Sequence, residues 1–152
     1  MKAIPNYPYC FVCGDKNERG LNVRFYSHKG KAKAEYTPTR EFEGYRDILH
    51  GGIISALLDE VMIQAIIAQG ILTFTTQIEV NFKKPARIGE KLLLEGEVTG
   101  DRGKIIMTRG EAAKEDGTII ATSSGKFFKA TEEMKKLLEQ RGSGPQSRQR
   151  WE

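Results

Sequence analysis

The sequence lacks the features that mark membrane, secreted and repeat proteins. It has no run of about 18 or more apolar residues, and its first residues, MKAIPNYPYC, contain no apolar stretch typical of a signal peptide. Two cysteines are too few for the disulfide framework of a small secreted protein, and no internal repeat or helix-turn-helix segment is evident. We therefore expect a non-secreted, cytoplasmic protein without a membrane partner.

The composition is that of one globular domain. The chain has 152 residues, of which 39% are hydrophobic and 29% charged, enough to build a core. Its formal net charge of +4 favours anionic partners such as phosphorylated cofactors, acidic lipid or nucleic acid, although many proteins with a mild basic excess bind no polyanion. Because basic and aromatic residues are not interleaved, we do not expect nucleic-acid binding.

The N-terminal third predicts an arm followed by a hairpin. Residues 1–20 are rich in Pro, Tyr, Gly and Asn without a clean period, which indicates an ordered loop or arm. Residues 21–26 and 31–36 have strand character, and the sequence HKG between them supplies a turn. A polar loop is expected over residues 38–46.

One strong helix is predicted from about Gly51 to Gln69, with Gly70 as its C-terminal stop. Apolar residues cover almost its whole circumference. A helix that is apolar on every side is a buried helix.

The remainder predicts four antiparallel strands and a short helix. The strands are expected over residues 73–84, 91–98, 104–114 and 118–130. Turns are expected at Gly100–Gly103 and at the Asp116-Gly117 pair. Thr131 can cap a short helix over residues 132–140, and residues 141–152 are expected to be a disordered tail.

The order of these elements predicts an α+β fold. A helix apolar on every side has to be wrapped, and the available material is a curved antiparallel sheet, with a partner subunit on the other faces. This arrangement is the hotdog fold, expected here over residues 21–130.

Polar residues interrupt the predicted helix at only a few positions, including Asp59 and Glu60. Carboxylates are rarely buried without a partner or a task. Adjacent residues on a helix point about 100° apart, so these two cannot face one cavity. Either acid could act chemically, or it could lie at a subunit seam or bond a neighbouring backbone.

The sequence His50-Gly51-Gly52 precedes the helix. Two glycines let a substrate approach the backbone, and the first-turn N–H groups lie at the positive end of the helix dipole without intrahelical acceptors. They can form an oxyanion hole for a thioester carbonyl. The alternative is a tight turn with a weak glycine cap, in which His50 is a structural hydrogen-bonding residue.

The spacing between these features predicts a homodimer. Gly51 and Asp59 are eight residues apart, or about 12 Å along a helix. A reacting carbonyl must lie roughly 3 Å from both its oxyanion donor and its nucleophile or base. Two such helices packed antiparallel about a twofold axis can place Asp59 of one chain beside Gly51 of the other, giving two composite sites.

Longer stretches carry a family resemblance. The sequences GYRDILHGGIISALLDEVM, TTQIEVNFKKPARIGEKLLLEGEV and CFVCGDKNERGLNVRFY resemble hotdog-fold thioesterases of the phenylacetate-pathway and human thioesterase-superfamily-member type, over residues 10–129. The shared features are a His, an acid nine residues later, and a strand that ends in an aromatic residue, a Pro and a Gly-Glu turn. Here they are His50, Asp59, Phe82, Pro85, Gly89 and Glu90.

The resemblance implies roles for the catalytic residues. Asp59 would be the nucleophile or the general base, the Gly51 N–H would polarise the carbonyl, and His50 would orient the loop or the sulfur. Thr75 would help to position water, with Thr76 an equally near candidate. One departure is Gly44, which stands where some members have an Asn six residues before the His.

The resemblance also implies the substrate, an acyl-CoA that is hydrolysed to a free acid and coenzyme A, with no cofactor beyond the coenzyme A of the substrate itself. Gly52 and Phe82 would contact the substrate. The apolar residues themselves suggest Met62, Ile66, Phe74 and Tyr45 as walls of a pocket for an apolar acyl chain or aryl ring. A basic cluster at a strand end would meet the nucleotide phosphates, or would be a solvated strand end. The cluster is Lys83, Lys84 and Arg87. The homodimer can in turn pair into a dimer of dimers.

Other readings of the sequence remain open. Cys10 and Cys13 are half of a zinc-ribbon signature, but zinc needs four ligands and only His28 and His50 remain as imidazoles, so we expect no metal site and two thiols packed in a small turn. The chain could instead be a non-catalytic acyl-CoA-binding hotdog module. A hotdog hydratase or dehydratase is a further alternative, although neither histidine is placed to form the acid–His pair that those enzymes use.

Overall fold

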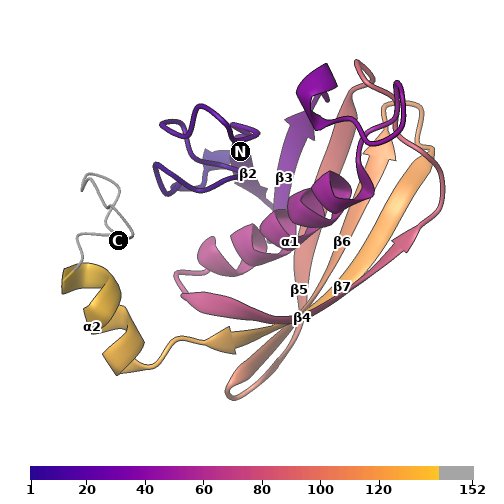
Figure 1. The fold of residues 1–152 in the computed structure, drawn as a ribbon. Coiled ribbons are helices and arrows are strands. Elements are labelled where there is room, and N and C mark those ends of the chain that lie inside the picture. The colour runs from indigo at the N-terminus through magenta and orange to yellow at the C-terminus, as the bar shows by residue number, and fades with distance from the viewer. Residues whose placement is uncertain (141–152) are drawn as a thin grey trace.

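A computed structural model of the chain describes residues 1–140 (Figure 1). The predicted disordered tail, residues 141–152, lies outside them. The strands are β1 (Lys2–Ala3), β2 (Phe25–His28), β3 (Lys31–Tyr36), β4 (Thr73–Phe82), β5 (Leu92–Arg102), β6 (Ile105–Lys114) and β7 (Ile119–Lys129). The helices are the 3₁₀ turn η1 (Arg40–Phe42), α1 (Gly51–Ile67) and α2 (Glu132–Gln140). Within residues 1–140, no helix combines the length and the apolar character needed to cross a bilayer.

The strands form one antiparallel sheet in the order β1-β2-β3-β5-β6-β7-β4. The sheet curves around α1, which lies across its inner face (Figure 1). The predicted α+β hotdog fold is therefore confirmed. The first strand after the helix, β4, pairs with the last strand, β7, and so forms one edge of the sheet.

Helix α1 is buried because it has no polar face to turn toward water. Its buried residues are Ile54, Leu57, Leu58, Val61, Met62, Gln64, Ala65 and Ile66.

Glycines in the middle of the sheet let α1 approach closely. Gly96 of β5 pairs with Gly110 of β6 beneath the helix. A Cβ built on Gly96 would lie 2.3 Å from the carbonyl oxygen of Val61, and one on Gly110 would lie 3.1 Å from Cγ of Met62. The helix therefore rests directly on the sheet backbone.

The predicted hairpin is present but begins later than expected. The His28–Lys31 pair closes a two-residue loop in which Lys29 and Gly30 both have positive φ. Residues 21–24 were predicted as strand and lie outside it. Their backbone pairs with the arm instead, since the N–H groups of Leu21 and Val23 donate to the carbonyls of residues 11 and 12.

The predicted turn at Gly100–Gly103 is also wrong in its position. Strand β5 continues through Arg102, which pairs with Ile105, so the loop contains only Gly103 and Lys104. A β-bulge between Val98 and Gly100 accommodates the extra residue. By contrast, the predicted Thr131 cap is confirmed, because its Oγ1 accepts from the N–H of Met134 at 3.2 Å.

Candidate active site

Asp59 lies on the third turn of α1, half-buried, and faces the start of β4. The Thr75 hydroxyl donates to its Oδ1 at 2.9 Å. Burial raises the pKa of Asp59, the hydrogen bond from Thr75 opposes that effect, and the charge of Glu60 adds to it. The result is a fixed carboxylate with increased proton affinity, which suits a base.

A β-bulge selects Thr75 over Thr76. Strand β4 pairs with β7 through Thr75 and Phe127 and then through Gln77 and Lys126, so Thr76 is the extra residue between them. The sequence left the two threonines equivalent, since nothing in it marks the bulge. In the folded chain it is Thr75 that contacts the acid.

The start of α1 leaves one backbone donor free. His50 is the N-cap, and its Nδ1 accepts from the Gly52 N–H at 2.8 Å, which places the ring proton on Nε2. The N–H groups of Ile53 and Ile54 both donate to the carbonyl of His50. Within residues 1–140 the Gly51 N–H has no acceptor, and it lies at the positive end of the helix dipole.

These contacts define the hydrogen bonding of each residue in the HGG sequence. Nδ1 of His50 accepts from the Gly52 N–H, a contact that both interpretations of the HGG sequence allow. Of the two glycine N–H groups, only that of Gly51 is without an acceptor in the described part of the chain. Gly44, the position that departs from the family, packs against His50: a Cβ there would lie 3.3 Å from the Cα of His50.

Phe82 lies beside Gly51 at the end of β4. A Cβ on Gly51 would be 3.5 Å from Cε1 of the Phe82 ring, and this ring is 54% exposed. Gly51 and Phe82 therefore lie together at the end of β4, and Asp59 and Thr75 lie together near its start.

The basic cluster lies next to the HGG loop. The Leu49 N–H donates to the carbonyl of Ala86, and Ile48 bridges to Arg87, so the loop is held against the segment after β4. Lys83 and Lys84 are exposed in this segment.

Arg87 has a partner that the sequence did not suggest. Its guanidinium lies 3.6 Å from Asp47, a non-glycine residue with a φ of 65°. Both side chains are more than half exposed, so this ion pair is weak and leaves the guanidinium open to a second anion.

The predicted acyl-pocket walls are only partly accessible. Met62 and Ile66 are fully buried in a cluster with Ile106 and Phe127, because their face of α1 rests on the sheet. In a single chain they do not line an open pocket, which corrects that expectation. Phe74 is 42% exposed near Asp59 at the start of β4.

Comparisons with known proteins agree with this fold and find similarity to thioesterases. The Thioesterase superfamily profile matches residues 47–121, a stretch that contains every predicted site residue. A protein of Archaeoglobus fulgidus named "Putative esterase" is 28% identical over 134 residues, covering 88% of this chain and 85% of that one. Mouse acyl-coenzyme A thioesterase THEM5 is 26% identical over 107 residues, which are 70% of this chain and 43% of that protein.

Solved structures share the fold. The thioesterase superfamily protein RHA08564 has a TM-score of 0.76 and 26% identity, and the match covers 80% of this chain and 60% of that protein. A hypothetical thioesterase from Streptococcus pneumoniae, solved with coenzyme A, has a TM-score of 0.68 and 17% identity over 72% of this chain and 89% of that one.

Replacement of Asp59 by Asn tests the electrostatics of the site. Because burial raises the pKa of Asp59, the native state holds this proton more tightly than the unfolded chain does. The stability that protonated Asp59 contributes is fully present below its pKa in the unfolded chain and is lost as pH rises through its pKa in the folded chain. Asp59→Asn keeps an acceptor for Thr75 but removes the charge, so we expect a higher Tm than the wild type at neutral pH.

Thermal unfolding of both proteins from acid to neutral pH measures this difference. It should be smallest at acid pH, where Asp59 is protonated, and should grow to a plateau as pH rises. A variant less stable than the wild type at neutral pH, or a difference independent of pH, would contradict the assignment.

Proposed function

We propose that this hotdog-fold chain, which resembles the thioesterase superfamily in sequence and structure, hydrolyses an acyl-CoA thioester to a free acid and coenzyme A. The observation that carries the proposal is the combination, on one helix, of a free N–H at Gly51 with a half-buried carboxylate at Asp59. The name of mouse THEM5 and the coenzyme A bound to the S. pneumoniae protein support the substrate class.

The reaction requires two copies of the chain. Gly51 and Asp59 are about 12 Å apart along α1, too far to contact one carbonyl group. Strand β4 supplies a way to join two copies, because it is a sheet edge whose side chains are mostly exposed, including Phe74 and Phe82. Exposed apolar edge strands favour pairing with another strand.

Antiparallel pairing of β4 with its copy, centred near the middle of the strand, would bring the two halves of the site together. The Thr75 end of one strand would then lie near Phe82 of the partner subunit. Because Thr75 holds Asp59 and Phe82 packs beside Gly51, each Asp59 would come next to Gly51 of the partner subunit. Such a twofold interface forms two equivalent sites.

The chemistry then follows from the groups in each site. The carbonyl oxygen of the thioester accepts a hydrogen bond from the Gly51 N–H, and this bond strengthens as negative charge develops on the oxygen. Asp59 either takes a proton from an attacking water and passes it to the departing sulfur, or attacks the carbonyl carbon to form a mixed anhydride that a water molecule then hydrolyses to the free acid, its proton going to the sulfur. Thr75 holds the carboxylate in place. The carbon–sulfur bond breaks and coenzyme A leaves as the thiol. Its phosphates meet the basic cluster of Lys83, Lys84 and Arg87.

Hydrolysis of a panel of acyl-CoAs tests the proposed activity. We expect the wild type to turn over at least one member, and Asp59→Asn to lower kcat by about 100-fold or more, as loss of a catalytic base does. The matched control is Glu111→Gln, which changes an exposed carboxylate on β6 far from Asp59 and should keep full activity. Tight binding of acyl-CoA by the wild type without turnover would instead identify a non-catalytic binding module.

A second pair of variants distinguishes the effect of losing the Gly51 N–H from the effect of filling the space beside Gly51. Proline removes the N–H and is accepted at the first position of a helix. His50, with a φ of −59° and a ψ of 133°, already has the extended conformation that a residue before proline adopts. Alanine keeps the N–H and adds only a methyl group at ordinary contact distance from Phe82. We expect Gly51→Pro to lower kcat by about 10²–10³-fold, and Gly51→Ala to remain far more active. Equal losses in both variants would show that crowding, and not the missing donor, is responsible.

A further inference from the structure

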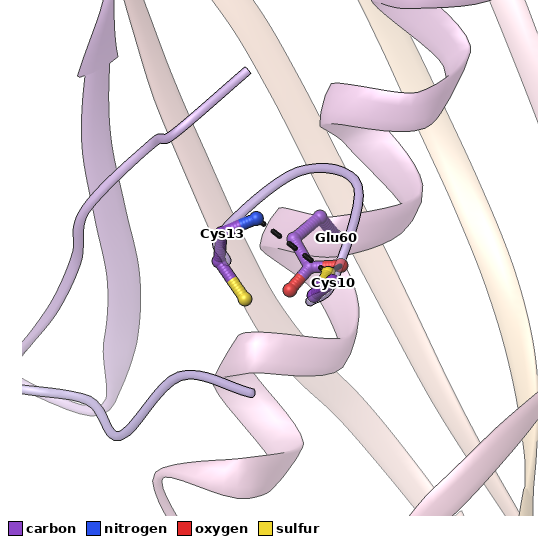
Figure 2. A group of neighbouring side chains, drawn as sticks. All are labelled: Cys10, Cys13 and Glu60. Carbon is purple, nitrogen blue, oxygen red and sulfur yellow. Dashed lines mark hydrogen bonds between the residues drawn. The ribbon is translucent and has the colours of Figure 1, made fainter. Parts of the chain in front are cut away.

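The only two cysteines of the chain meet a glutamate from a distant part of the sequence. Cys10 and Cys13 lie in the N-terminal arm, and Glu60 lies on α1 immediately after Asp59 (Figure 2). The two sulfur atoms and a carboxylate oxygen all lie within 4.8 Å of one another, and Sγ of Cys10 is 3.6 Å from Oε2 of Glu60. The three residues thus present their ligand atoms to one small space.

The turn that carries the cysteines is built to hold a thiolate. The backbone N–H of Cys13 donates to Sγ of Cys10 at 3.5 Å, and the N–H of Gly14 donates to the carbonyl of Cys10 at 2.9 Å. A Cβ on Gly14 would lie 2.5 Å from that carbonyl oxygen, so the turn requires glycine.

Gln64 joins two of these groups from one helical turn beyond Glu60. It is 1% exposed, and its Nε2 donates to Oε1 of Glu60 at 2.7 Å and to Sγ of Cys13 at 3.7 Å. Within residues 1–140 its Oε1 is buried and has no hydrogen-bond partner. An unsatisfied buried amide oxygen is costly, and a half-turn of the amide would direct it into the cluster.

We propose that Cys10, Cys13 and Glu60 bind one zinc ion, with Oε1 of Gln64 or a water molecule as the fourth ligand. Thiolate sulfur and carboxylate oxygen are both established zinc ligands, and four of them satisfy its tetrahedral preference. Binding replaces the thiol protons, which pass to solvent, and the zinc charge compensates three anionic ligands that otherwise repel one another.

The site joins the N-terminal arm to the catalytic helix. Asn6 donates to the carbonyl of Cys13 at 2.9 Å, so the ligand turn is itself fixed to the arm. Glu60 adjoins Asp59, and a zinc ion on Glu60 would hold this part of α1 to the arm on the side away from the proposed chemistry. The role is structural, and it does not depend on the proposed hydrolase activity.

Metal titration of the full-length, metal-free and reduced protein tests the site. Cobalt(II), used as a spectroscopic substitute for zinc, should produce thiolate-to-cobalt charge-transfer absorption that saturates at one ion per chain and is abolished by added zinc. Because loss of even an outer-shell group commonly weakens metal binding by about 10–100-fold, Glu60→Gln should raise the Kd by at least tenfold. Glu111→Gln, a matched change on the outer face of the sheet, should leave the Kd unchanged.

Thiol reactivity provides a second readout that needs no variant. Both cysteines belong to the site, so one zinc ion per chain should protect both from a thiol reagent. Absence of the charge-transfer absorption, unchanged thiol reactivity with zinc, or a folded Glu60→Gln variant that binds as tightly as the wild type would overturn the proposal. Formation of a Cys10–Cys13 disulfide in place of metal binding would overturn it as well.

Discussion

A helix without a polar face imposes the main constraint on this molecule. Helix α1 is apolar around its circumference, so it is stable only where other parts of the chain remove every side of it from water. The curved sheet covers one side, and the glycines at positions 96 and 110 bring it into backbone contact. The N-terminal arm covers another side, where its residues Ile4 and Val12 join the same core cluster.

The polar groups on such a helix need specific surroundings, and each of them lies where the apolar covering of α1 is interrupted. Asp59 faces the start of β4, where Thr75 holds it, while Glu60 points to the arm and the two cysteines. The Gly51 N–H lies at the end of the same helix, where no turn precedes it to accept the hydrogen bond. Because Gly51 and Asp59 lie about 12 Å apart along one helix, one chain holds all the proposed catalytic groups and yet cannot bring them together.

The sequence could predict those parts of the fold that depend on periodicity and turn chemistry. The all-round apolar pattern located α1 to within two residues of its end, and alternating strands with Lys-Gly and Asp-Gly turns predicted the antiparallel sheet. It failed where long-range backbone pairing decides the outcome. Residues 21–24 have strand composition but pair with the arm, and the bulge in β5 displaced the turn expected at Gly100.

The candidate site was predictable as a set of residues but not as a set of contacts. The HGG sequence and the acid nine residues after His50 are visible in the chain, whereas the choice of Thr75 over Thr76 depends on a bulge, and the ion pair of Arg87 depends on Asp47 across a loop. The meeting of Glu60 with Cys10 and Cys13 depends on where the arm crosses α1. For that reason, the sequence offered only His28 and His50 as further ligands for Cys10 and Cys13, and no metal site was expected.

The central claim is that each active site combines Asp59 of one chain with Gly51 of another, and mixing two inactive variants tests it most directly. Chains that carry only Asp59→Asn and chains that carry only Gly51→Pro would be unfolded together in equal amounts and refolded. Half of the dimers would then be mixed, and each of these would contain one intact site, so activity should return to about a quarter of the wild-type value. Mixed dimers that form but remain as inactive as either parent would contradict the shared site.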